Sequence, residues 1–459
     1  MAVDGIVAPD RVSSLLEREL SRFVEARPRS LELRRRASES MPGGVPVSWM
    51  AQLHGHPPVY VDSGAGAHFT DVDGHRYFDT NIADTSMFGG YGPEPVVRAV
   101  ADRTRRGTQF LQPVEDAIFV AEDLVRRYSL PKWQFTLAAT TANTEVFRLA
   151  RYATGRDVVL MFEGKYHGHG DEMLVHLGEH GESEPEYVGL PARVTSQTRL
   201  VQFNDVEALA AQLSRGDVAC VVTEPALTNL GVIRPDDGFH DALRRLTREA
   251  GTLLVLDETH TQICGPGGLT KRWGLDPDIV TLGKSIGGGV PIGAYGMTGA
   301  LADRFEEGIH ADVGAGMAGT ENELATGGTL FGNALSMAAA RAALTEVLTD
   351  DVYERTSELG VRLADGIEAV AEANGLPWRA HRLYARSGYA FTGRLCRNAM
   401  EAHEDHRGEL YRLLRLFMAN RGVWEAIELA GPAVSVPASS ADVDGYLTVL
   451  SEFAEAVSA

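Results

Sequence analysis

Four short, continuous apolar runs in the middle of the chain constrain its fold more than any other feature. Each is followed by a segment long enough to hold a helix, such as Gly238–Ala250. Continuous apolar runs of this length are typical of parallel strands buried on both faces. Their alternation with helices is typical of α/β folds with right-handed crossovers. We therefore predict a mostly parallel sheet that includes residues 158–162, 219–223, 253–256 and 279–282.

The two ends of the chain have a different pattern. Helical spacing of apolar residues predicts helices over 13–26, 30–40, 333–348, 352–373 and 441–457. Asp73-Gly74, between 67–70 and 77–79, is a hairpin signal, and 388–392 is strand-like. A chain of 459 residues is too long for one small core. We predict a large α/β domain over 86–340 and a smaller α+β domain built from both chain ends, 1–85 and 341–459.

The net charge and the cysteine content restrict the possible partners and the expected location of the protein. The net charge of −20 repels phosphate backbones, so we expect no nucleic-acid partner and a small-molecule substrate. The three cysteines show no paired spacing and no secretory leader is recognisable, which predicts a cytoplasmic protein. No apolar stretch reaches the roughly 18 residues that a membrane span needs, so we expect no membrane partner.

Three chemically reactive residues follow three of the predicted strands: Glu224, Asp257 and Lys284. In parallel sheets ligands bind at the carboxyl ends of strands, so these side chains should converge. A lysine amine forms a Schiff base with an aldehyde, and a carboxylate keeps a pyridine nitrogen protonated. That combination is typical of a pyridoxal-phosphate site. A surface lysine in a glycine-rich turn is the alternative for Lys284 alone, and the acid before it argues against that alternative.

Two segments are candidates for binding the cofactor's phosphate. Ala138–Asn143 precedes a predicted helix, and Gly327-Gly328-Thr329 precedes another at Asn333. Free amides at a helix N-terminus and a threonine hydroxyl bind phosphate well, although a helix cap without a ligand explains either segment equally well. His167-Gly168-His169 with Asp171 carries metal-ligand side chains. Beside a cofactor site we expect no metal there.

Several short motifs occur in a fixed order along the chain. They are Met41-Pro42-Gly43-Gly44, Asp71-Val72-Asp73-Gly74, Arg148-Leu149-Ala150-Arg151, Tyr166-His167-Gly168, Glu224-Pro225, Leu256-Asp257-Glu258, Gly283-Lys284, and Gly328-Thr329 with Gly332-Asn333. With them the chain resembles class III aminotransferases, fold-type I enzymes that use pyridoxal 5'-phosphate, over residues 38–455. Within that family it is most similar to the glutamate-1-semialdehyde 2,1-aminomutase and β-amino-acid aminotransferase branches.

The resemblance implies a role for each candidate residue and a homodimer with shared active sites. Lys284 carries the cofactor as a Schiff base and shuttles the proton, while Asp257 binds the pyridine nitrogen. Tyr166 stacks on the ring, or is an ordinary core tyrosine; Glu224 orders the surroundings, or is a structural carboxylate. The remaining expected cofactor contacts are Ala139 and Thr140 at the phosphate, Gly328 and Thr329 toward the phosphate of the neighbouring subunit, and His167, Thr259 and His260.

The chain also departs from the family pattern. Ala138-Ala139-Thr140 stands where Ser-Gly-Ser or Ser-Gly-Thr is usual, which removes one hydroxyl and weakens cofactor binding by ~1 kcal/mol. Thr259 and His260 follow the acidic pair where a valine is usual. His260 either tunes the phenolic oxygen of the cofactor, contacts the substrate, or is a packed histidine.

Fewer residues indicate the substrate than indicate the cofactor. The loop Val45–Met50 has no arginine for a substrate carboxylate, and Trp49 stands there instead. Arg386 or Arg394 would then hold the carboxylate, or the substrate lacks one. We expect Asp84 either to contact a cationic or hydroxylated group of the substrate or to cap a turn.

The resulting function hypothesis is an aminotransferase that moves an amino group from a small amino donor to a keto or aldehyde acceptor. An aminomutase or racemase on the same scaffold is the alternative. Residues 429–431 lack the acidic residue expected of an aminomutase, which favours the aminotransferase. A third hypothesis, a fold that has lost catalysis and binds a ligand or partner, conflicts with the retention of Lys284 and Asp257.

Overall fold

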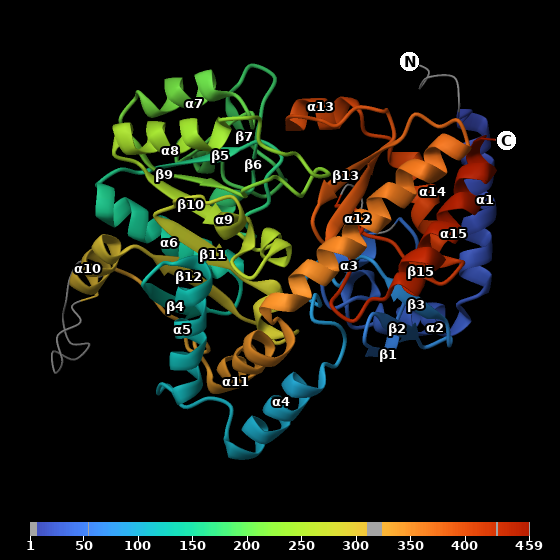
Figure 1. Ribbon diagram of the computed structural model, residues 1–459, viewed down its shortest axis with the longest axis horizontal. Coiled ribbons are helices and arrows are strands. Elements are labelled where there is room, and N and C mark those ends of the chain that lie inside the picture. Colours follow the sequence, from blue (N-terminus) through green and yellow to red (C-terminus); the bar gives the residue numbers. More distant parts are fainter. Residues whose placement is uncertain (1–6, 54, 310–323, 428–429, 459) are drawn as a thin grey trace. The chain divides into compact units, whose positions relative to one another are not determined.

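The computed structural model describes residues 7–53, 55–309, 324–427 and 430–458 (Figure 1). The chain divides into two compact units. The large unit comprises Glu94–Asp350 with Arg397–Glu401, and the terminal unit comprises Met1–Pro93, Asp351–Cys396 and Ala402–Ala459. Within the described ranges no helix is long and apolar enough to cross a membrane.

A seven-stranded sheet forms the centre of the large unit, and six of its strands run in one direction while β12 runs in the opposite direction. The predicted apolar runs become β5, β9, β10 and β11, each buried along most of its length, which confirms the mostly parallel sheet. In sheet order the strands are β4 (Lys132–Thr136), β12 (Gly293–Met297), β11 (Ile279–Leu282), β10 (Leu253–Asp257), β9 (Val218–Thr223), β5 (Val158–Phe162) and β8 (Thr198–Val201). A separate two-stranded sheet pairs β6 (Val175–Leu177) with β7 (Ser183–Pro185).

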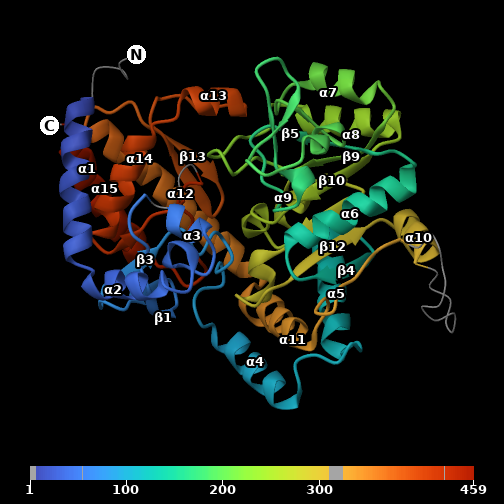
Figure 2. The ribbon, with the colours of Figure 1, turned by 180° about the vertical axis from the view of Figure 1, so that it is seen from behind.

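Helices of the large unit cover this sheet (Figure 2). α6 contacts β4, β9, β11 and β12 with an apolar face whose spacing is helical, and its Val146, Phe147 and Ala150 are fully buried. The α-helices are α4 (Glu94–Arg106), α5 (Glu115–Tyr128), α6 (Ala139–Thr154), α7 (Val206–Leu213), α8 (Phe239–Ala250), α9 (Gly268–Arg272), α10 (Gly299–Gly308) and α11 (Ala334–Ala342). Shorter helical turns are η2 (Asp171–Met173), η3 (Ala192–Ser196), η4 (Thr261–Cys264), η5 (Lys284–Gly287) and the π-helical η6 (Ala343–Val347).

The helix predicted over 333–348 forms as α11 followed by η6, and it lies in the large unit. Its Ala339, Ala342 and Ala343 pack with Val96 of α4 in one buried cluster. This packing of small side chains continues past residue 340, so the unit extends to Asp350 rather than ending inside the helix.

Both chain ends build the terminal unit. β15 pairs in parallel with β3, and the predicted hairpin forms as β2 and β3. One sheet has the order β1 (Val61–Ala65), β2 (His68–Asp71), β3 (Arg76–Asp79) and β15 (Val423–Trp424), and a second pairs β13 (Arg379–Leu383) with β14 (Arg386–Ala390). The other helices of this unit are α1 (Pro9–Glu25), α2 (Pro28–Ala37), η1 (Pro42–Gly44), α3 (Trp49–Gln52), α12 (Asp350–Ala373), α14 (Gly408–Ala419) and α15 (Ser440–Ser458), while α13 (Ala399–Glu404) is divided between the two units.

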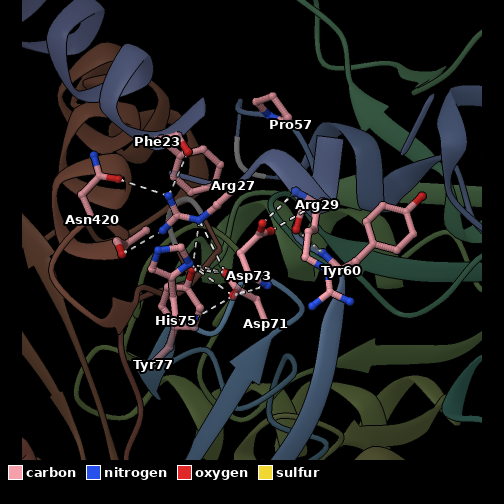
Figure 3. Close-up of polar contacts among 12 residues, drawn as sticks. Phe23, Arg27, Arg29, Pro57, Tyr60, Asp71, Asp73, His75, Tyr77 and Asn420 are labelled. Atoms are coloured by element: carbon pink, nitrogen blue, oxygen red, sulfur yellow. Dashed lines mark hydrogen bonds and ion pairs between the residues drawn. The ribbon is translucent and has the colours of Figure 1, made fainter. Parts of the chain in front are cut away.

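The two aspartates of the Asp71-Val72-Asp73-Gly74 motif hold the hairpin to the N-terminal helices (Figure 3). Asp73 accepts hydrogen bonds from the backbone amides of Arg29 (2.7 Å) and Ser30 (3.0 Å), in the first turn of α2. A carboxylate at a helix N-terminus satisfies amides that have no partner within the helix. Asp71 is buried and lies 3.7 Å from Arg27. These contacts give the motif a structural role in the terminal unit.

His56 is a buried imidazole in the same unit. Its ring centroid lies 4.2 Å from that of Phe23 and 5.7 Å from that of Trp424, and its Nδ1 pairs with the carbonyl of Pro57 at 2.8 Å. Burial lowers the pKa of His56 to about 3, and the positive charges of Arg415 and Arg27 act in the same direction. The folded protein therefore keeps this ring neutral where an unfolded chain would protonate it.

We expect His56→Gln to make the protein less sensitive to acid. Because the folded pKa is about 3 and the unfolded pKa is 6.5, the contribution of His56 is complete above pH 6.5 and is lost as pH falls toward 3. The loss is at most about 1.4 kcal/mol per pH unit. Denaturant unfolding as a function of pH, with the exposed His403→Gln as control, measures it. Equal slopes in wild type and His56→Gln would contradict the expectation.

Candidate active site

The register of three neighbouring strands brings Glu224, Asp257 and Lys284 to one edge of the large sheet. Leu256 in β10 lies opposite Thr223 in β9, and Asp257 lies opposite Thr281 in β11. Glu224 follows β9 directly, and Lys284 begins η5 just after β11. The three side chains therefore start from the carboxyl ends of adjacent parallel strands, as their positions in the sequence predict.

Asp257 is a buried carboxylate with three hydrogen-bond donors. Its Oδ2 accepts from Asn143 Nδ2 (3.0 Å) and pairs with His167 Nδ1 (2.9 Å), and its Oδ1 accepts from the amide of Thr259 (3.0 Å). Burial by itself raises the pKa of Asp257. Hydrogen bonds from His167, Thr259 and Asn143 and the positive charge of His167 lower this pKa. Together they outweigh burial and hold the pKa at about 2. Asp257 is thus a fixed negative charge at neutral pH.

Several buried polar atoms around this carboxylate have no hydrogen-bond partner in the described part of the chain. They are His167 Nε2, Asn143 Oδ1 and Thr259 Oγ1. Buried polar groups are nearly always paired, because leaving one unpaired costs about 1–3 kcal/mol. Three of them on the direct neighbours of one carboxylate indicate a polar site that a bound group completes.

The backbone at Lys284 is held in an unusual conformation. Its φ angle is +52°, in the left-handed region that residues other than glycine rarely adopt, at a cost of order 1 kcal/mol. Gln262 Nε2 donates to the carbonyl of Gly283 and to that of Thr259, both at 2.8 Å. This amide ties the lysine segment to the Asp257 segment, a function that the sequence analysis did not assign to Gln262.

The amine of Lys284 contacts the ring of His260. Nζ of Lys284 and Nε2 of His260 form a short hydrogen bond, and Nδ1 of His260 pairs with the hydroxyl of Thr228 at 2.8 Å. That hydroxyl donates to Glu224 at 2.5 Å, and all three partners are buried. The position of His260, left open by the sequence, is therefore beside the lysine amine. Thr228 has no motif signal and was missed.

Glycines surround the start of α6, where a phosphate was expected. A Cβ atom on Gly168 would lie 2.5 Å from the hydroxyl of Thr140, and one on Gly283 would lie 3.0 Å from the amide of Ala139. The backbone before Lys284 and the backbone after His167 therefore both reach the first turn of α6 closely. The hydroxyl of Thr140 accepts a hydrogen bond from the amide of His169 at 3.3 Å. The amides of this first turn are oriented to bind an anion.

The other expected cofactor residues lie on the surface of the large unit. Tyr166 is 48% exposed, in the segment after β5. Gly328 and Thr329 are exposed, and the side-chain amide of Gln109 donates to the carbonyl of Thr329.

The four candidate substrate residues belong to the terminal unit. Trp49 is half-exposed on α3, and Asp84 lies in a run of four left-handed residues, 82–85. Arg386 is buried in β14, where its Nε donates to a backbone carbonyl at 2.8 Å. Arg394 donates to Asp405 at 3.0 Å. Leu429, in the segment where an acidic residue was expected, lies outside the described residues.

A mostly parallel sheet that places a buried carboxylate and a lysine amine at the ends of adjacent strands is typical of fold-type I enzymes, which use pyridoxal phosphate. The chain belongs to the class-III aminotransferase family, whose sequence model matches residues 49–377. Its cofactor is pyridoxal 5'-phosphate.

Relatives in the family match the chain over nearly its full length. A glutamate-1-semialdehyde 2,1-aminomutase from Chloroflexus aggregans is 34% identical over 91% of this chain and 95% of its own. A crystal structure of a glutamate-1-semialdehyde-aminomutase from Pseudomonas aeruginosa PAO1 is 38% identical, with a TM-score of 0.93 over 98% of this chain and 100% of its own. A lysine-to-alanine variant of it was solved with PMP. A β-phenylalanine aminotransferase from Variovorax paradoxus is 26% identical, with a TM-score of 0.85 over 96% of this chain and 97% of its own.

The residues present fit this cofactor. We propose that Asp257 holds the protonated ring nitrogen, that Lys284 forms the covalent link, and that Ala139 and Thr140 bind the phosphate at the N-terminus of α6. The unpaired atoms around Asp257 and the glycine-lined approach to α6 support this assignment. His167 and Asn143 then act on the cofactor through Asp257, because their hydrogen bonds keep it charged.

We expect Gly168→Ala to weaken binding of pyridoxal phosphate about tenfold or more, since one lost phosphate contact costs about 1.5–3 kcal/mol. Gly168 has φ +124°, and an added Cβ would displace Thr140. Gly155→Ala is the matched control, because Gly155 also has a left-handed φ (+67°) but has open space around it. Both variants lose stability, and only Gly168→Ala should lose affinity in equilibrium dialysis. Equal affinity losses would place the phosphate elsewhere.

Proposed function

We propose that this enzyme moves an amino group between neighbouring carbons of one small molecule, with glutamate 1-semialdehyde as the first substrate to test. The main support is the similarity in fold to a glutamate-1-semialdehyde-aminomutase, at a TM-score of 0.93 over 98% of the chain. The full-length sequence relatives carry the same name. This proposal replaces the aminotransferase with the isomerase that the sequence analysis gave as its alternative.

The reaction needs a proton to be removed from a carbon that bears nitrogen and returned elsewhere. When bound, pyridoxal phosphate accepts the electrons of the broken bond. Asp257 keeps the ring nitrogen charged, which makes that acceptance favourable. The Lys284 amine takes the proton and returns it, acting first as a base and then as an acid. Gln262 holds the two segments together, so that the amine and the carboxylate keep a fixed separation.

An intermolecular aminotransferase is the second candidate. It is favoured by residues 429–431, which lack the acidic residue expected of an aminomutase, and by the likeness to a β-phenylalanine aminotransferase at a TM-score of 0.85. Both reactions use the same base and the same anion. They differ in whether the amino group leaves with one substrate or returns to it.

The two candidates differ in their need for a second substrate. With glutamate 1-semialdehyde as sole substrate, an aminomutase yields the isomer with the amino group on carbon 1 and a carbonyl on carbon 2. An aminotransferase moves the amino group between molecules, so it either needs an added donor or acceptor or converts this amino aldehyde to diamino and dicarbonyl products. We expect catalytic turnover to the isomer without either addition, measured by the proton NMR spectrum of the product because substrate and isomer have equal mass. A requirement for a donor would contradict the aminomutase and favour the second candidate.

Active-site variants separate loss of chemistry from loss of fold. Lys284→Ala should abolish turnover, and Asp257→Asn should lower it at least about 100-fold, because the ring nitrogen loses its fixed counter-charge. Asp278→Asn is the matched control: Asp278 forms an ion pair with Arg244 at 2.8 Å and precedes β11, at its amino end. It should lower stability and leave turnover within a few-fold. Near-normal rates in Lys284→Ala would overturn the proposal.

We also propose that two copies of the chain form a homodimer with shared active sites through the surface around Thr329. The exposed apolar side chains of Phe110, Leu111 and Leu330 support it, since 109–111 contacts Thr329 through Gln109. Large apolar groups gathered on a surface mark interaction sites. Gly328 and Thr329 would then approach the phosphate bound by the partner subunit.

A charge placed in this surface should separate the subunits. We expect Leu111→Asp, at a site that is 70% exposed, to convert a dimer to a monomer in sedimentation velocity, since a buried unpaired charge is costly in an interface. Val188→Asp, on another exposed segment, is the control and should remain dimeric. A wild-type monomer at micromolar concentration would contradict the homodimer.

A further inference from the structure

A continuous chain of hydrogen bonds runs from the amine of Lys284 to a buried carboxylate. Nζ of Lys284 meets Nε2 of His260, and Nδ1 of His260 meets the hydroxyl of Thr228 at 2.8 Å. The hydroxyl of Thr228 then meets Oε2 of Glu224 at 2.5 Å, and the backbone amide of Thr228 donates to Oε1 at 3.2 Å. Thr228 is fully buried, and Glu224 and His260 are less than a tenth exposed.

The chemistry of these groups fixes the direction of every bond. A carboxylate only accepts hydrogen bonds, so the single hydroxyl proton of Thr228 points to Glu224. The oxygen of Thr228 is then left as an acceptor toward His260, so Nδ1 of His260 carries the ring proton. A neutral imidazole has one donor and one acceptor nitrogen. Its Nε2 therefore presents a lone pair to the amine of Lys284.

We infer that Glu224 and Thr228 fix the tautomer of His260 so that this ring accepts a proton from Lys284. Glu224 and Thr228 are positioning residues in this arrangement, and His260 is the proton acceptor. The inference deepens the proposed function, because it rests on Lys284 as the reacting amine. It also assigns a role to His260, which the sequence left open, and to Thr228, which no motif marks.

The proton transfer balances within these four side chains. A protonated Lys284 gives one proton to Nε2 of His260, which leaves a neutral amine with a free electron pair and a positively charged imidazole. Nδ1–H stays bonded to Thr228, and the negative charge of Glu224 lies 3.8 Å from Nδ1. Among the described contacts, the charged groups that face the ring are Lys284 at one nitrogen and Glu224 at the other. The neutral amine is the form that attacks an aldehyde or removes a proton.

Substitutions at Thr228 test the inference at the hydroxyl that pairs with Nδ1 of His260. Thr228→Val keeps the shape and removes the hydroxyl, and Thr228→Ser restores it. Thr247→Val is the matched control, since Thr247 is also fully buried in the large unit and, among the described residues, its hydroxyl bonds to carbonyls of α8. The nitrogen resonances of histidine-labelled protein, with His260 assigned by its loss in His260→Gln, report the tautomer.

The second readout is the rate at which pyridoxal phosphate links to Lys284 in the full chain stripped of cofactor, without any substrate. Absorbance follows the reaction, and mass spectrometry after borohydride reduction locates the adduct. We expect a protonated Nδ1 in wild type, Thr228→Ser and Thr247→Val, and its loss in Thr228→Val. We expect linkage to slow about tenfold in Thr228→Val and His260→Gln, the low end for loss of an acid–base partner, with Thr228→Ser near wild type.

The outcomes separate this inference from the proposed function. A protonated Nε2 in wild type, or unchanged linkage rates in Thr228→Val and His260→Gln, would overturn the inference even if the enzyme is an aminomutase. Slowing of the same size in Thr247→Val would do so too, because general destabilisation would then explain it. The expected pattern together with a failed aminomutase assay would leave the inference standing and remove only the substrate assignment.

Discussion

The parallel register of β9, β10 and β11 is the constraint on which the rest of the site depends. Since Leu256 lies opposite Thr223 and Asp257 opposite Thr281, the residues after these strands emerge at one edge. An isolated charge is expensive to bury, and the hydrogen bonds of Asn143, His167 and the Thr259 amide offset that cost for Asp257. The carboxylate thereby stays charged in a position that the sheet itself sets.

The sequence predicts the sheet well because its strands are buried on both faces and are therefore apolar along their whole length. Asp257 and Lys284 stand out for the same reason: each is a charged residue that directly follows such a run or comes soon after it. The partners of Asp257 are harder to predict. Asn143 lies on α6, far earlier in the chain, and reaches Asp257 only through the packing of that helix on the sheet. Periodicity contains no information on contacts of that kind.

His260 illustrates the same limit. Its position after the acidic pair suggests a role near the cofactor, but its contacts depend on Thr228, which no motif marks. The hydrogen-bond chain becomes visible only when β9 and β10 are paired and the segments that follow them are brought together. The same limit applies to the boundary between the two units. The alanines of α11 resemble any apolar helical face in the sequence, and their packing on Val96 shows that this helix belongs to the large unit. Local pattern gives the element, and tertiary packing decides where it belongs.

The named partners of Asp257 and Lys284 all belong to the large unit, and their chemistry is the same for an aminomutase and an aminotransferase. Removing a proton and returning it needs a base and an electron acceptor in either reaction, so these residues cannot distinguish the two. Discrimination requires groups that retain or release the nitrogen-bearing molecule between half-reactions. The predicted substrate contacts, Trp49, Asp84 and the two arginines, belong to the terminal unit, where Arg394 is paired with Asp405. The residues described around Asp257 and Lys284 therefore support the cofactor chemistry of either reaction and leave substrate retention to other groups.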